Sequence, residues 1–278
     1  MADSIELQRM RAKVEAISAL PTVPSNLRQI SVMLEKPRLT MDEIARFVSN
    51  DPALTTKVLK MVNSAAYGFP GRISSVSHAI MLLGLNVIRG LLLGISVFDL
   101  MQKNMAGLWE HSCACAVAAR CLAQQKKMKE PEEVSICGLL HDIGKAIVML
   151  QYPSEYDQAL QEAKDKDISL YEAEKKYLAA THAEVGLWLA QKWRFPANLV
   201  EAIGFHHRPQ LATQAPLETA IVHVADLLVR AKGVGFAGDP FVPPVHPATW
   251  QLLQLSDDDI KSILTQIDES ASAVEEED

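Results

Sequence analysis

Apolar residues recur along this chain with the spacing of amphipathic helices. The segment from Ala53 to Ala66, for example, carries an apolar stripe at helical spacing. No sustained alternation of apolar and polar residues and no hairpin turn signal point to strands. Ala, Leu, Val and Ile supply most of the apolar mass, whereas aromatic residues make up only 6% of the chain. The pattern therefore predicts an all-α protein made of close-packed helices.

Residues typical of helix boundaries divide this pattern into about a dozen helices. Three capping boxes, at residues 40–43, 169–172 and 181–184, place Ser or Thr three residues before Glu and mark helix starts. Other positions carry residues typical of N-caps, first turns and C-caps. They are Asp51, Pro52, Gly84, Asn86, Pro131 and Pro196. Of these, Gly84 is expected to close one helix and Asn86 to open the next.

The distribution of histidines predicts two helical bundles. Residues 1–105 are expected to form an N-terminal bundle that contains a single histidine, His78. Residues 106–232 are expected to form a second, histidine-rich bundle. Residues 233–278 begin with a Gly- and Pro-rich loop, which a short helix from Pro247 and a frayed acidic tail follow. The three parts can pack as one compact unit.

Charge and hydropathy exclude several classes of partner. A formal net charge of −7 gives no broad attraction to nucleic acid. The N-terminus has neither the basic nor the apolar segment of a signal peptide. The most apolar stretch, from Ala79 to Leu100, is interrupted by Arg89 and several glycines, so it predicts a buried helix pair instead of a membrane span. We therefore expect a cytoplasmic protein without nucleic-acid or membrane partners.

The four cysteines are expected to be small, buried thiols in a reducing cytosol. They are Cys113, Cys115, Cys121 and Cys137. Because Cys113 and Cys115 are two residues apart in helical sequence, they point to different faces of the helix. Neither a zinc-binding pair nor a disulfide is expected from them.

A histidine–aspartate pair in an apolar run is the feature that points to chemistry. His141 and Asp142 stand between the apolar segments 136–140 and 146–150. Adjacent helical residues project about 100° apart, so both side chains can face one neighbouring cavity. A carboxylate in such surroundings is costly to bury unless it is paired or bound to metal. The pair is therefore the nucleus of a candidate metal site.

Further histidines and one aspartate extend this candidate site. The additional residues are His111, His182, His206, His207 and Asp226. Together with the pair they supply five imidazoles and two carboxylates from five helices, enough to bind two ions that share Asp142. Each residue alone also has an ordinary interpretation, such as a surface histidine or a buried helix-pairing acid. The metal hypothesis therefore depends on the whole set.

The remaining histidines are expected to play no part in this site. His223 stands three residues before Asp226 on a similar helix face, and we interpret it as structural. His78 and His246 have no ligand-like neighbours in the sequence. Glu184 belongs to a capping box and is given no catalytic role.

The order of these residues resembles the HD superfamily of metal-dependent phosphohydrolases. It is also similar to the HD-GYP branch, whose members hydrolyse cyclic di-GMP at a centre of two or three metals. In this chain Arg208-Pro209-Gln210 follows the histidine pair, so the Gly-Tyr-Pro loop of that branch is missing. Gly107 stands where some relatives carry a Glu for a third metal, so no third ion is expected.

Motifs in the first bundle resemble the HDOD family of the HD superfamily. They are Leu20-Pro21-Thr22-Val23-Pro24, Asn50-Asp51-Pro52-Ala53-Leu54, Lys60-Met61-Val62-Asn63-Ser64-Ala65, Arg72-Ile73-Ser74-Ser75 and Ala79-Ile80-Met81-Leu82-Leu83-Gly84. The resemblance covers roughly residues 15–230. It implies an HD-type helix bundle preceded by an N-terminal helical bundle, and a role in bacterial signalling. Many HDOD domains have lost the HD ligands, whereas this chain retains a full set.

Two functions follow from the resemblance and stay open here. In the first, the chain is a regulatory HDOD module that acts through signalling proteins, and its metal centre is structural or sensory. In the second, it is a metal-dependent phosphohydrolase or phosphodiesterase acting on a nucleotide or cyclic dinucleotide. A minor third interpretation is oxygen-dependent redox chemistry at two irons, which some HD relatives perform.

The resemblance also implies roles for individual residues. Asp142 would bridge two divalent or iron-type ions, one completed by His111, His141 and Asp226 and the other by His182, His206 and His207. Iron is the first expectation for the metal, with Mn, Ni or Zn as alternatives. In the hydrolase interpretation Asp142 and Lys145 are the catalytic candidates, because Lys145 would offset charge on phosphoryl oxygens of a nucleotide or phosphate ligand. The alternative for Lys145 is a solvated lysine at the end of a helical turn.

Overall fold

A computed structural model describes residues 2–19, 25–64, 67, 69 and 72–275 of the chain. Throughout these residues the secondary structure is helical and contains no strand, which confirms the all-α prediction. The first helices are α1 (Ala2–Glu15), the 3-10 helix η1 (Ile17–Ala19), α2 (Ser25–Leu34), α3 (Met41–Ser49), α4 (Pro52–Val62) and α5 (Val76–Asn104). The motif at residues 20–24 lies outside the described part of the chain.

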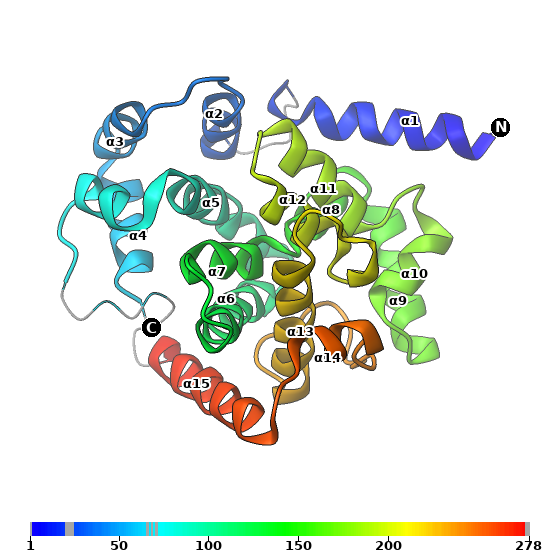
Figure 1. The fold of residues 1–278 in the computed structure, drawn as a ribbon. Coiled ribbons are helices and arrows are strands. Elements are labelled where there is room, and N and C mark those ends of the chain that lie inside the picture. The colour runs from blue at the N-terminus through cyan, green and yellow to red at the C-terminus, as the bar shows by residue number, and fades with distance from the viewer. Residues whose placement is uncertain (1, 20–24, 65–66, 68, 70–71, 276–278) are drawn as a thin grey trace.

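The second half of the chain adds ten further α-helices and one 3-10 helix within the described residues. They are α6 (Leu108–Gln125), α7 (Pro131–Leu140), α8 (Ile143–Gln151), α9 (Pro153–Lys166), α10 (Leu170–Tyr177), α11 (His182–Lys192), α12 (Ala197–Phe205), η2 (Pro209–Leu211), α13 (Pro216–Lys232), α14 (Pro247–Leu253) and α15 (Asp257–Glu275). Helices α5, α6 and α7 lie centrally, with α3 and α4 on one side and α9 and α10 on the other (Figure 1).

Most helix starts lie where the sequence predicts them. At Thr40 and Thr181 the hydroxyl accepts the N–H of the Glu three residues later, and that Glu accepts the N–H of the Thr. Ser169 makes only the first of these bonds. Pro196 is the N-cap of α12 instead of a first-turn residue. At Gly84 the backbone turns to φ 79°, so α5 consists of two helical segments, as expected.

The most apolar helix belongs to the core. Residues Val76–Val97 have a mean hydropathy of 2.0 and are long enough to cross a membrane, but 72% of that stretch is buried inside the protein. Helix α5 packs against α2, α3 and α4 on one side and against α6, α7 and α8 on the other. Its burial by other helices therefore agrees with the interpretation as a core helix pair.

Buried polar contacts join the N-terminal helices to the second bundle. Arg89 of α5 donates hydrogen bonds to the backbone oxygens of Trp193, at the end of α11, and of Leu34, at the end of α2. The indole of Trp193 donates to Ser31 Oγ of α2 at 2.7 Å. Helix α1 also packs against α11. The histidine-bearing helix α11 and the residue that follows it are therefore in direct contact with α1, α2 and α5.

The C-terminal region is more helical than the sequence indicates. The helix expected from Pro247 is present as α14, but a second helix, α15, follows and continues to Glu275 through the predicted frayed tail. Helix α15 packs on α6 and α13, where Ile263 and Ile267 are fully buried. The acidic composition of the tail concealed this apolar face, whose residues recur at helical spacing.

Glu201 stabilises the connection between α12 and α13. Its side chain is only 6% exposed and accepts hydrogen bonds from the backbone N–H groups of Thr213, Gln214 and Ala215. Burial raises the pKa of Glu201, but these N–H donors outweigh burial and lower the pKa below its ordinary value. The carboxylate thus fixes the segment that returns the chain from the histidine pair to α13.

We predict that Glu201→Gln destabilises the protein by about 1–3 kcal/mol at neutral pH, because charge-assisted hydrogen bonds are lost. Because the pKa of Glu201 is lower in the folded state than in the unfolded state, its carboxylate contributes stability at pH values above the unfolded-state pKa. This contribution is lost as the pH falls through the folded-state pKa. Urea unfolding should therefore show a smaller difference in unfolding free energy between variant and wild type at pH 3 than at pH 7. Glu130→Gln, at an exposed position, serves as the control. An equal difference in unfolding free energy at both pH values would contradict this role of Glu201.

Candidate metal centre

Asp142 lies at the centre of the predicted ligand set, and its two oxygens face different groups of side chains. Oδ2 is 3.3 Å from His141 Nε2 and 3.8 Å from His111 Nε2. Oδ1 is 3.2 Å from His182 Nε2 and 3.6 Å from His206 Nε2. One carboxylate is thereby positioned between two groups of imidazoles, as a bridging ligand would be.

The backbone around Asp142 differs from the prediction. His141 and Asp142 do not lie within one helix, because α7 ends at Leu140 and α8 begins at Ile143. Gly144, in the first turn of α8, makes the close approach of α11 possible. A Cβ built on Gly144 would come within 1.9 Å of the His182 carbonyl oxygen. A larger residue at this position would therefore push the helix that carries His182 away from Asp142.

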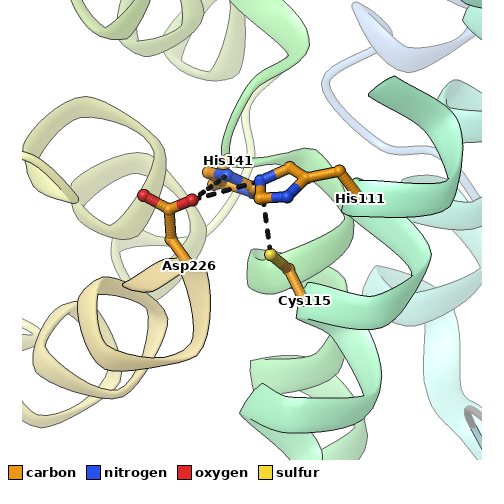
Figure 2. A group of neighbouring side chains, drawn as sticks. All are labelled: His111, Cys115, His141 and Asp226. Atoms are coloured by element: carbon orange, nitrogen blue, oxygen red, sulfur yellow. Dashed lines mark hydrogen bonds and ion pairs between the residues drawn. The ribbon is translucent and has the colours of Figure 1, made fainter. Parts of the chain in front are cut away.

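The first group of ligand atoms comes from α6, α13 and the turn between α7 and α8. His111, Cys115, His141 and Asp226 each offer one atom, and these atoms all lie within 4.8 Å of one another. Asp226 Oδ1 is 3.1 Å from His111 Nε2 and 3.8 Å from His141 Nε2. Figure 2 shows the carboxylate and the thiol converging on the two imidazoles from different helices. We call these four residues the first cluster.

The second group, here the second cluster, contains Asp142, His182, His206 and His207. Its ligand atoms also lie within 4.8 Å of one another. His207 Nε2 is 3.0 Å from His182 Nε2, and the ring of Tyr171 lies 4.4 Å from that of His207. The structure therefore brings all seven predicted ligands together as two adjacent clusters.

Hydrogen bonds at Nδ1 orient three of these imidazoles. His141 donates to the carbonyl of Gly138 at 2.7 Å, and His206 donates to the carbonyl of Ile203 at 2.8 Å. His182 donates to Glu174 Oε2 at 2.7 Å. Since these acceptors fix the proton on Nδ1, the Nε2 lone pair is directed at the cluster in each neutral ring. Metal-binding histidines are oriented by outer partners in the same way.

Several buried atoms of the clusters have unsatisfied bonding capacity. His141 Nε2, His206 Nε2 and Asp142 Oδ1 are buried and make no hydrogen bond. Orphaned polar atoms of this kind are costly unless a ligand occupies the space between them. The donor set of imidazoles and carboxylates also suits iron, manganese, nickel or zinc. The residues present therefore fit a metal centre.

Burial favours the neutral form of three imidazoles, whereas at His182 burial is outweighed by Glu174, which raises the pKa. Burial lowers the pKa values of His111, His206 and His207, the last two well below the ordinary range. Burial raises the pKa of Asp142, but His141 and Lys145 outweigh burial and hold the pKa well below its ordinary value. Neutral imidazole and ionised carboxylate are the forms that coordinate metal ions.

Two buried cations accompany the two carboxylates. Lys145 is fully buried and donates to Asp142 Oδ2 at 2.6 Å and to the Ala237 carbonyl at 2.7 Å. Arg230 donates to Asp226 Oδ1 at 2.8 Å and to Asp239 Oδ1 at 3.2 Å. The interpretation of Lys145 as a solvated lysine is therefore wrong, because the loop after α13 covers its ammonium group.

That loop, residues 233–246, covers the first cluster and bonds to several surrounding elements. Phe236 N donates to the Gly107 carbonyl at 2.9 Å. A Cβ built on Gly235 would come within 2.3 Å of His111 N, so the loop backbone lies directly on the start of α6. Asp239 accepts the N–H of Leu170 at 2.9 Å. The first cluster and Asp142 are therefore enclosed, whereas His207 of the second cluster is half-buried.

His223 and His246 belong to neither cluster. His223 donates from Nδ1 to the His206 carbonyl at 2.7 Å and accepts the N–H of His246 at Nε2, so both ring nitrogens are engaged. His246 is the N-cap of α14. His223 thereby holds the covering loop and the histidine pair of α12 against α13.

Three residues of the site were not found from sequence. Cys115 belongs to the first cluster, and its position four residues after His111 was the available signal, because such residues share a helix face. Arg230 likewise stands four residues after Asp226 on the same helix. Glu174 gives no such signal, since it is eight residues from His182 and belongs to another helix.

The fold and this site define an HD-type helical protein. The HDOD domain family matches residues 20–209, more than half of the chain, and the chain therefore belongs to that family. Asp226 and the covering loop lie beyond the matched residues.

Similar proteins include both sequence relatives and a solved structure. A protein of unassigned function from Treponema pallidum is 30% identical over 213 residues, covering 73% of this chain and 42% of that protein. Ribonuclease Y of Mycoplasmoides gallisepticum is 31% identical over 140 residues, covering 49% of this chain and 21% of the enzyme. The chain thus spans less than half the length of these two relatives. An HDOD domain protein of unknown function from Geobacter sulfurreducens has the same fold, with a TM-score of 0.70, 28% identity and 98% of each chain covered.

We predict that Glu174→Gln lowers metal affinity at the second cluster by about 10–100-fold, because a charged outer-shell partner of His182 is lost. Competition with a chelator of known affinity measures the change. Glu172→Gln on the same helix is the matched control, since Glu172 is exposed and pairs with Lys175. Equal affinities of the two variants would show that Glu174 does not orient a ligand.

Proposed function

We propose that this chain is a regulatory HDOD module built around a dinuclear metal centre, and that it acts through protein partners in bacterial signalling. The two clusters would hold one ion each, with Asp142 shared between them. Bound ions would cross-link α6, α11, α12, α13 and the α7–α8 turn. Iron is the first candidate metal, and manganese, nickel and zinc suit the same imidazole and carboxylate ligands.

The burial of the shared carboxylate beneath the covering loop is the observation that carries this proposal. Asp142 and Lys145 are both 0% exposed, and Lys145 is held by that loop at Ala237. A phosphate ester that approached Lys145 would have to displace the loop, and among the cluster residues only His207, in the second cluster, is half-buried. The sequence after His207 also lacks the Gly-Tyr-Pro loop of the related diesterases. Both features favour a structural or sensory centre over an open active site.

Removal of metal tests the centre itself. We predict close to two equivalents of metal per chain by elemental analysis of the purified protein. Ligands that bind only the folded state, at 100 times their dissociation constant, stabilise by about 2.7 kcal/mol per site. A chelator should therefore lower the melting temperature by about 5 °C or more. A fully folded, metal-free protein whose melting temperature does not respond to added metal would contradict the proposal.

A second candidate function is hydrolysis of a phosphodiester. The similarity to ribonuclease Y favours it, as does a buried ammonium group next to the shared carboxylate. Two bound divalent ions supply Lewis acidity for the attack of water on phosphorus. Asp142 would hold both ions, and Lys145 would offset negative charge that develops on the phosphoryl oxygens. A nucleotide or cyclic dinucleotide is the substrate class that the family resemblance implies.

Turnover by the metal-loaded protein separates the two candidates. For the regulatory module we expect no hydrolysis of bis-p-nitrophenyl phosphate or cyclic di-GMP when both sites are filled. For the hydrolase we expect turnover that Asp142→Asn abolishes and that the exposed Glu172→Gln leaves unchanged. Turnover retained in Asp142→Asn would exclude the hydrolytic mechanism described above.

A further inference from the structure

The thiol of Cys115 is part of the first cluster. Cys115 lies one helical turn after His111 on α6, so both side chains leave the same face of the helix. Its sulfur is fully buried and lies 3.5 Å from His111 Nε2. Figure 2 shows the sulfur directed at the imidazoles of His111 and His141. This position differs from that of a thiol that merely fills space in the core.

Two separations in the first cluster match those of ligands on one zinc ion. Zinc binds sulfur at about 2.3 Å and imidazole nitrogen at about 2.0–2.1 Å, which separates the two ligand atoms by about 3.6 Å at a tetrahedral angle. The separation of Cys115 Sγ from His111 Nε2 is 3.5 Å. Asp226 Oδ1, at 3.1 Å from His111 Nε2, also lies within the range of two ligands on one ion. His141 Nε2, at 3.8 Å from Asp226 Oδ1, would move slightly closer on binding.

An independent observation indicates that a ligand belongs at this position. His141 is 0% exposed, its Nε2 atom makes no hydrogen bond, and its Nδ1 proton is already donated to Gly138. The lone pair of Nε2 is thus left buried and directed into the same space as the thiol. The second cluster, by comparison, contains three imidazoles and a carboxylate but no sulfur.

We propose that Cys115 is a metal ligand, and that His111, Cys115, His141 and Asp226, together with the shared Asp142, form a site selective for zinc. The inference rests on the proposed metal centre and names the metal at one of its two positions. On zinc binding the thiol proton passes to solvent, and the thiolate adds a negative charge to that of Asp226, which is already paired with Arg230. Soft thiolate ligands favour zinc over harder divalent ions, whereas the sulfur-free second cluster suits iron, manganese or nickel. The centre is therefore a mixed one, with zinc at one position.

Spectroscopy of the metal-loaded full chain tests this assignment. X-ray absorption at the zinc edge of the wild-type protein, loaded with one equivalent of Zn²⁺, should show a sulfur neighbour at about 2.3 Å. The Co²⁺-loaded protein should show thiolate-to-cobalt charge-transfer absorption in the near ultraviolet. Both signals should disappear in Cys115→Ala, and its affinity for the first equivalent of zinc should fall by at least about 10-fold.

Cys113→Ala is the matched control, because Cys113 lies on the same helix and outside both clusters. It should keep the sulfur signal and the zinc affinity of the wild type. Wild-type protein that binds zinc with nitrogen and oxygen neighbours alone would overturn the assignment and leave the metal centre standing. Failure to bind any metal would instead overturn the proposed function. If Cys115→Ala does not fold, the wild-type spectrum still decides the question.

Discussion

The buried carboxylate of Asp142 is the constraint on which the rest of the site depends. It is 0% exposed, and an ionised group in such a position costs several kcal/mol unless charges and hydrogen bonds compensate. Lys145 compensates one oxygen at 2.6 Å, while the other oxygen makes no hydrogen bond. Imidazoles from α6, α11, α12 and the α7–α8 turn surround the pair. The helices are thus arranged around one charge that the apolar core alone could not accommodate.

The parts of the site and fold that could be predicted are those whose residues are unusual in their local sequence. Asp142 and Asp226 occur in apolar runs, where a carboxylate is conspicuous, and the imidazoles around them follow a recognisable order. Helix starts were predictable because a capping box is a local pattern, complete at Thr40 and Thr181. Both kinds of signal are contained within a few residues of sequence, so tertiary structure was not needed to detect them.

The residues that sequence analysis missed depend on contacts between distant segments. Cys115 resembles the alanines around it until α7 and α13 bring His141 and Asp226 beside its sulfur. Arg230 gains its second carboxylate partner only where the loop 233–246 brings Asp239 beside it. Glu174 acquires its role only because α10 and α11 pack together. In each case the chemistry is set by a neighbour whose position no local pattern specifies.

Helix α11 connects the centre physically to the first bundle. It begins with His182, which faces Asp142, and it leads into Trp193, whose indole donates to Ser31 of α2 and whose carbonyl accepts from Arg89 of α5. A helix is a continuous hydrogen-bonded element, so α11 joins the ligand set to the packing of α2 and α5 without a break in its backbone hydrogen bonding. The centre and the N-terminal helices are therefore tied together by the two ends of one helix, whereas the covering loop contacts the centre separately, at Lys145.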